Sequence, residues 1–175
     1  MARVPDAEGD GEVGDRIRRR RPGGVLRPID RVLLHSPAVA DGWNSLLGTL
    51  RNGTALRADL RELVVLRIAV LNDAAYEWDS HVPDAEAAGI GTAQRAALRA
   101  PDPSSAGEFD DLQRAVIAVT DAMTRDLHVR DALFAELAGR LGVARLVELV
   151  VTVAAYNMVS RLVVALGVET PAGAS

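Results

Sequence analysis

Apolar residues recur at helical spacing along most of the chain, and no stretch of any length alternates apolar and polar residues as a half-buried strand would. The segment RELVVLRIAVL at residues 61–71 is apolar on most sides, which predicts a central helix. The pattern therefore predicts an all-α fold. The helices are expected over residues 36–50, 59–71, 74–88, 92–100, 110–125, 129–141 and 143–166.

Residues that start and stop helices stand at the edges of these segments. Ser36 precedes Pro37, which is the arrangement of an N-cap followed by proline at the first helical position. Gly89 is expected to end one helix, and Gly142 is expected to separate the last two. Pro83 falls inside a predicted helix and is expected to kink it.

Composition narrows the class of protein further. Apolar residues make up 49% of the 175 residues but aromatic residues only 3%, so Ala, Val and Leu must build the core, which favours packed helices. The net charge of −4, with acids and arginines interspersed, gives no reason to expect a nucleic-acid partner. The absence of cysteine excludes disulfides, thiol nucleophiles and thiolate metal sites.

The chain is expected to hold one folded domain between two short terminal segments. Residues 1–24 are rich in Gly, Pro and charge and are predicted to be a flexible leader, residues 25–168 a helical domain, and residues 169–175 a short tail. The leader has no apolar segment of the kind found in a secretory signal, so the expected location is the cytoplasm. The longest apolar run, 146–166, contains Glu148, Asn157 and Arg161, which indicates a buried helix rather than a membrane span.

Candidate chemistry concentrates in AAYEWDSH at residues 74–81. On a helix, Glu77 and His81 are four residues apart and lie on one face, which Ala74 and Ala85 extend with small side chains. This spacing is compatible with an exposed ion pair, with two metal ligands, or with an acid/base pair. The residues around Ser80 do not match the nucleophile elbow that holds a catalytic serine, so Ser80 is expected to be a polar residue without a catalytic role.

Spacing alone does not decide among these interpretations. An exposed ion pair at this spacing contributes only ~0.2–0.5 kcal/mol to stability. A metal site would need further ligands, and His35 and His128 lie in other segments with no fixed spacing to the pair, so no metal is predicted.

The sequence resembles the carboxymuconolactone decarboxylase / alkylhydroperoxidase-D-like family over roughly residues 30–168. The similarity is carried by RELVVLRIAVLNDAAYEWDSHVPDAEAAGI, by TRDLHVRDALFAEL and by LVELVVTVAAYNMVSRLVVALGV. The resemblance implies a multi-helix, all-α fold that assembles as a homo-oligomer, usually a trimer or hexamer. It also implies no cofactor. The interrupted apolar run 146–166 separately gives no reason to expect a membrane partner.

Within that resemblance, the redox branch of the family has a glutamate, then C-x-x-C, then a histidine four residues after the second cysteine. Glu62 and His81 match the glutamate and the histidine, whereas Ala74 and Glu77 occupy the two cysteine positions. A thiol peroxidase cycle cannot run without those thiols. The chain resembles instead the cysteine-free branch with the pattern YEWxxH.

Two functions remain compatible with these residues. The first is a cofactor-independent enzyme in which Glu77, His81 and Glu62 relay protons to a small carbonyl or enol-lactone substrate, in decarboxylation, isomerisation, lactone opening or ring closure. The second is a non-catalytic oligomeric binding or accessory protein that keeps the family scaffold. The residues expected to bind the substrate of the enzyme are Arg161, Tyr156, Asn157 and Arg67.

Overall fold

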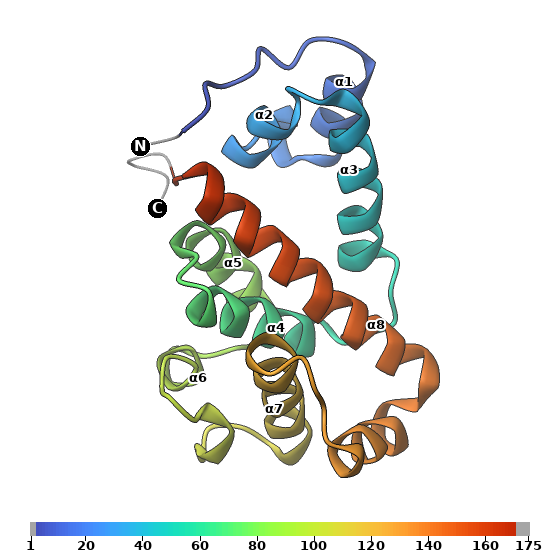
Figure 1. The fold of residues 1–175 in the computed structure, drawn as a ribbon, viewed down its shortest axis with the longest axis vertical. Coiled ribbons are helices and arrows are strands. Elements are labelled where there is room, and N and C mark those ends of the chain that lie inside the picture. Colours follow the sequence, from blue (N-terminus) through green and yellow to red (C-terminus); the bar gives the residue numbers. More distant parts are fainter. Residues whose placement is uncertain (1–2, 171–175) are drawn as a thin grey trace. The chain divides into compact units, whose positions relative to one another are not determined.

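A computed structural model describes residues 3–170 and shows only helices and turns over these residues (Figure 1). This confirms the predicted all-α class. The chain divides into two compact units, one of residues up to Gly53 together with those from Val163 onward, and the other of Thr54–Leu162. The elements are α1 (Glu12–Arg20), η1 (Pro22–Gly24), α2 (Pro28–Leu33), α3 (Pro37–Asn52), α4 (Ala58–Leu71), α5 (Ala75–Ala87), α6 (Thr92–Ala97), η2 (Pro103–Ser105), α7 (Asp111–Arg125) and α8 (Asp131–Leu166).

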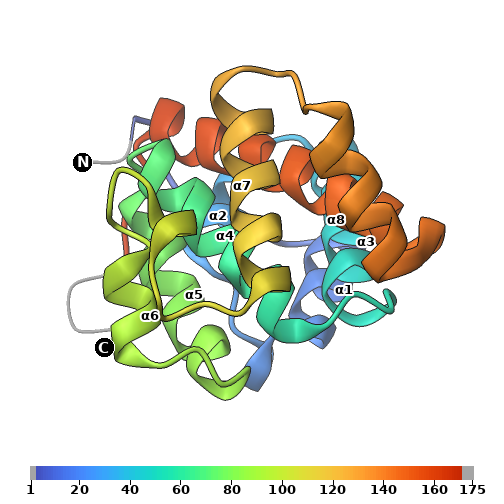
Figure 2. The same ribbon diagram turned by 90° about the horizontal axis from the view of Figure 1, so that it is seen from below.

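Helix α4 is the centre of the second unit. It packs against both α5 and α7, and α7 lies beside it in the view of Figure 2. Because its apolar residues surround the helix, it is buried on nearly every side, as the sequence predicts. The residues of α4 that are at most 3% exposed include Leu60, Leu63, Val64, Val65, Leu66, Ile68 and Ala69.

The predicted helix ends agree closely with the structure. α5 stops at Ala87, and Gly89 adopts a φ of 88°, a backbone conformation in which only glycine is unstrained. Gly142 has φ 74° and ψ 162° and interrupts the long segment α8, so the predicted separation at this residue is confirmed. Pro83 lies inside α5, and the helix continues past it to Ala87.

The N-terminus of α7 is closed by a capping box. The side chain of Asp110 accepts a hydrogen bond from the backbone N–H of Gln113 (2.8 Å), and the Gln113 side chain accepts one from the backbone N–H of Asp110 (3.2 Å). Asp110→Ala is therefore expected to lower the free energy of unfolding by ~1 kcal/mol in urea titrations. Asp111→Ala is the matched control and should cost less than ~0.5 kcal/mol, since Asp111 makes only an exposed ion pair with Arg114. Equal losses in the two variants would contradict the capping role.

The predicted leader is not a purely flexible segment. Residues 12–20 form α1, whose Ile17 is 2% exposed and which packs on α3 within the first unit. Just beyond it, the guanidinium of Arg21 donates two hydrogen bonds to the buried carboxylate of Asp30, at 2.8 and 2.6 Å. One apolar side chain and one buried bidentate ion pair thus fix a segment whose composition indicated only charge and turns.

The two compact units meet along the chain near Gly53 and near Val163, both inside the segment 25–168. That this segment is one domain stays a prediction. Only Glu169 and Thr170 of the predicted tail are among the described residues; 171–175 lie outside them.

Helix α8 is the one described helix long and apolar enough to span a membrane by composition. Half of its most apolar window is buried inside the protein, and Gly142 interrupts its backbone. These features are those of a core helix, as the sequence predicts.

Candidate active site

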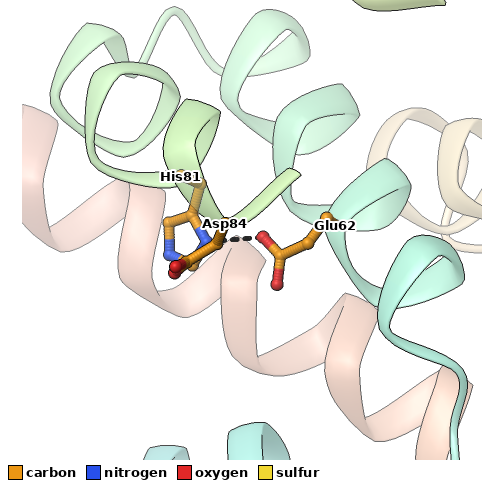
Figure 3. A group of neighbouring side chains, drawn as sticks. All are labelled: Glu62, His81 and Asp84. Carbon is orange, nitrogen blue, oxygen red and sulfur yellow. Dashed lines mark hydrogen bonds and ion pairs between the residues drawn. The ribbon is translucent and has the colours of Figure 1, made fainter. Parts of the chain in front are cut away.

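Helices α4 and α5 bring the side chains of Glu62 and His81 into direct contact within the second unit (Figure 3). The two helices run back along one another through a short turn in which Asp73 adopts a φ of 51° and the backbone N–H of Ala74 donates to Ala69 O. The Nδ1 atom of His81 lies 2.8 Å from Oε2 of Glu62. An ionised carboxylate can only accept a hydrogen bond, so Nδ1 carries the proton in this pair.

The pair is almost completely withdrawn from water. His81 and Glu62 are each 1% exposed, and Glu77 is 4% exposed. The interpretation of Glu77 and His81 as an exposed surface ion pair is therefore wrong. Burial makes each electrostatic contact here much stronger than it would be in water, because fewer solvent dipoles screen it.

Glu62 is held as a carboxylate by its neighbours. Burial acts to raise the pKa of Glu62, but the hydrogen bond and charge of His81, together with the ion pair from Arg61, outweigh it and lower the pKa overall. The Nε of Arg61 lies 3.0 Å from Oε1 of Glu62, so the two oxygens of this carboxylate have different partners. Glu62 is thus a fixed negative charge that orients the imidazole.

The second ring nitrogen of His81 faces the other carboxylate. Nε2 is buried, forms no hydrogen bond with any residue in the described part of the chain, and lies 3.7 Å from Oε2 of Glu77. That separation allows charge attraction but exceeds a hydrogen bond. Tyr156 of α8 meets the imidazole edge-on, with ring centroids 5.3 Å apart and planes at 87°, and so fixes the orientation of the ring.

The lowered pKa of Glu62 predicts a pH dependence of stability. Its pKa is lower in the folded chain than the ordinary value of 4.5, so its stabilising contribution is complete above about 4.5 and is lost as the pH falls through the folded value. Free energies of unfolding measured by urea titration from pH 7 to pH 3 should therefore fall less steeply below pH 4.5 in Glu62→Gln than in the wild type. An equal fall in the free energy of unfolding below pH 4.5 in the two proteins would show that Glu62 is not held as a carboxylate.

Asp84 completes a group of possible metal ligands with Glu62 and His81. One donor atom from each of the three side chains lies within 4.8 Å of the other two (Figure 3). Asp84 follows His81 by three residues on α5, so both side chains lie on the same face of the helix. Unlike the other two, Asp84 is exposed.

The residues expected to bind a substrate are mostly engaged elsewhere. Arg67 is 1% exposed and donates to both carboxylate oxygens of Asp121 at 2.6 Å and to the main-chain oxygens of residues 98, 100 and 101. With these bonds made, its guanidinium holds the α6–η2 segment on α4 and α7, and its expected role in binding a substrate stays a prediction. Asn157 donates to Thr124 and accepts from Asn72 and from Arg161. Of the four residues, the structure brings only Tyr156 against His81.

Two charged residues at the site were not predicted from the sequence. Arg61, rather than Arg67 or Arg161, pairs with Glu62, and Asp84 joins the cluster from the next turn of α5. The spacing of Asp84 to His81 is visible in the sequence, but it becomes meaningful only once His81 is known to be buried. The sequence did not indicate that Arg61 pairs with Glu62, since residues adjacent in a helix do not normally face one another.

A pocket of about 310 Å³ opens on the neighbouring side of α5. Ala74 and Trp78 line it together with Asp73, Asp79 and Arg99, and the Arg99 guanidinium stacks 3.8 Å above the Trp78 ring. Neither Glu77 nor His81 lines this pocket, although Trp78 follows Glu77 directly and Asp79 precedes His81 by two residues. The buried chemistry and this cavity are thus on different faces of the same helix.

Comparison with known proteins identifies the chain's relatives. Residues 37–121 match the model of the Carboxymuconolactone decarboxylase family. No curated protein matches the sequence.

Solved structures with the same fold include two peroxidase-related proteins that are described as uncharacterized. One, from Ralstonia eutropha and described as an alkylhydroperoxidase AhpD core, has a TM-score of 0.79 at 17% identity and covers 98% of this chain and 93% of its own. The other, from Silicibacter sp., has a TM-score of 0.77 at 16% identity and covers 90% and 83%. A protein of unknown function from Agrobacterium tumefaciens has a TM-score of 0.73 at 20% identity and covers 80% and 95%. At these identities the likeness establishes the fold.

Proposed function

We propose that this chain, which belongs to the carboxymuconolactone decarboxylase family, is a cofactor-independent acid/base enzyme acting on a small carbonyl or enol-lactone substrate. The observation that supports this most strongly is an imidazole that is 1% exposed and lies between two carboxylates, at 2.8 Å from Glu62 and 3.7 Å from Glu77. Such a constellation is suited to moving protons.

Each residue has a distinct part in the proposed chemistry. Glu62 holds the proton on Nδ1 of His81, so Nε2 keeps its lone pair and acts as the base. Nε2 takes a proton from the carbon next to the substrate carbonyl, and the electron pair of that C–H bond passes into an enolate. The imidazolium that results lies between Glu62 and Glu77, whose negative charges stabilise it.

The proton then returns to complete the reaction. Delivery to a different atom of the enolate gives isomerisation, ring opening or ring closure. In a decarboxylation, Nε2 first takes the proton of the substrate's carboxylic acid. CO₂ then leaves, its bonding electrons form the enolate, and the imidazolium returns that proton to carbon. Thiol peroxidase chemistry is not part of the proposal, because the sequence contains no cysteine.

A non-catalytic binding or accessory role is the second candidate, and one observation favours it. Glu77 and His81 are nearly inaccessible, and the neighbouring pocket is lined by neither. Binding of small enol-lactones and β-keto acids, followed by thermal shift, separates the two roles when the wild type is compared with His81→Ala. An enzyme requires ligands whose stabilisation depends on His81; a ligand that stabilises both proteins equally supports the accessory role.

The chain is also proposed to be a homo-oligomer through α8. Val147, Val151, Ala154 and Met158 are exposed and are spaced by four, three and four residues, so they form one stripe along the helix. Val151→Glu is expected to lower the mass found by light scattering at micromolar concentration, because it introduces a charge into this apolar stripe. Val39→Glu, on an exposed residue of α3, is the control and should leave the mass unchanged. A wild-type chain that is already monomeric would contradict the proposal.

A further inference from the structure

We infer that Glu62, His81 and Asp84 form a binding site for a divalent transition-metal ion, which binds in place of the proton shared between Glu62 and His81. The binding of the ion does not depend on the proposed enzyme activity. Its consequence for turnover does rest on that activity, because the same imidazole serves both purposes.

The positions of the donor atoms fit a single ion. All three lie within 4.8 Å of one another. Zn²⁺ binds nitrogen and oxygen ligands at ~2.0–2.2 Å, so two ligands of one ion are at most ~4.4 Å apart. Glu62 and His81 are already inside that limit at 2.8 Å, and a rotation of the exposed Asp84 side chain is enough to complete the set. Figure 3 shows Glu62 of α4 joined to His81 of α5, with the Asp84 carboxylate in front of the His81 ring.

The burial of two of the three donors favours a cation at this point. Glu62 and His81 are each 1% exposed, and their contact at 2.8 Å holds both donor atoms in place before an ion arrives. Glu62 and Asp84 supply two carboxylates to this group, and Arg61 pairs with Glu62. A divalent ion between the two carboxylates would be attracted by both.

The donor set selects the class of ion. One imidazole nitrogen with carboxylate oxygens suits Zn²⁺ and similar first-row ions, whereas Mg²⁺ and Ca²⁺ prefer oxygen ligands alone. Because Asp84 is exposed, it provides the path by which an ion enters from solvent. Arg61 already holds Oε1 of Glu62 and leaves Oε2 for the ion, which is the arrangement expected of an outer partner that orients a ligand.

Occupation of the site changes what His81 can do. With the ion on Nδ1, the one proton of the neutral imidazole lies on Nε2, which then has no lone pair to accept a proton. Glu62 can also no longer orient the ring through its hydrogen bond. The ion is therefore expected to stop the proton relay, so that turnover in Zn²⁺ is lower than turnover after treatment with a chelator.

Isothermal titration of Zn²⁺ into the full chain after dialysis against a chelator tests the site at pH 7. The wild type should bind one ion per chain, and its Tm should rise with Zn²⁺ but not with Mg²⁺. Asp84→Asn keeps the size of an exposed side chain and should weaken Zn²⁺ binding by about ten-fold or more. Glu86→Gln removes another exposed carboxylate of α5 that pairs with Arg95 and should bind Zn²⁺ as the wild type does.

Three results would overturn the inference. These are no Zn²⁺ binding by the wild type, equal affinity in Asp84→Asn and the wild type, or equal stabilisation by Mg²⁺. Equal Zn²⁺ affinity in the wild type and Asp84→Asn would indicate that the ion binds elsewhere, at His35 or His128. Since binding is measured without a substrate, failure of the metal site leaves the proposed enzyme activity untouched, and failure to find turnover leaves the metal site untouched.

Discussion

His81→Ala is expected to lower turnover by ~10²–10⁴-fold, which is the usual contribution of a positioned acid or base. The imidazole carries Nε2, the proposed base, and its removal leaves Glu62 and Glu77 without the ring that lies between them. Glu77→Gln keeps nearly the same shape but cannot ionise, and it should also lower turnover because the imidazolium loses one of its two counter-charges. The measurement is the initial rate of product formation by each variant at equal concentration.

The double variant distinguishes a shared function from two separate ones. If Glu77 and His81 act as a unit, then the double variant should be little slower than the worse single variant, since effects within one catalytic unit do not add. Glu86→Gln on the same helix is the control. It should keep wild-type turnover, because Glu86 is exposed and forms an ion pair with Arg95 and has no part in the proposed relay. Additive losses, or unchanged turnover in either single variant, would contradict the relay.

Arg67→Met should lower the free energy of unfolding by ~3–5 kcal/mol, the typical cost of leaving one partner of a buried ion pair without the other. The loss removes both hydrogen bonds from Arg67 to Asp121, which keeps its ion pair with Arg125, and those to three main-chain oxygens. Arg57→Met is the matched control. Arg57 also reaches an aspartate, Asp59, at 2.6 Å, but its side chain is 56% exposed, so the cost should be below ~1 kcal/mol.

Urea unfolding of the two arginine variants at pH 7 gives both numbers directly. A loss in Arg67→Met no larger than that in Arg57→Met would show that Arg67 is not structural. In that case its expected role in binding a substrate would return as the better explanation of why an arginine lies inside α4.

The sequence was sufficient for most of the helical architecture. A segment that is apolar all round, 61–71, has to be central, and α4 is buried on nearly every side. The helix ends at Gly89 and Gly142 could be predicted because both glycines adopt positive φ angles, which are strained for other residues. The pairing of Glu77 with His81 followed from helical spacing, which holds wherever the helix is placed.

Burial and partner choice could not be predicted in the same way. Whether Glu77 and His81 are exposed depends on how α4 and α8 pack over α5, which is a tertiary property. The same holds for Arg67, whose partners Leu98 and Asp121 are 31 and 54 residues away along the chain. The order of residues 12–21 depends on the burial of Ile17 and on the contact of Arg21 with Asp30, neither of which has a local pattern in the sequence.

Exchange of substrate hydrogen for deuterium from the solvent is the most direct test of the central claim, because this exchange reports proton abstraction even where no product forms. Small β-keto acids, their esters and enol-lactones would be incubated with the wild type in D₂O, and the protons next to the carbonyl followed by NMR. The account predicts that at least one compound exchanges faster with the wild type than without protein, and that His81→Ala and Glu77→Gln lower this rate by ~10²-fold or more. Exchange that is equally fast with the wild type and with both variants would contradict the account.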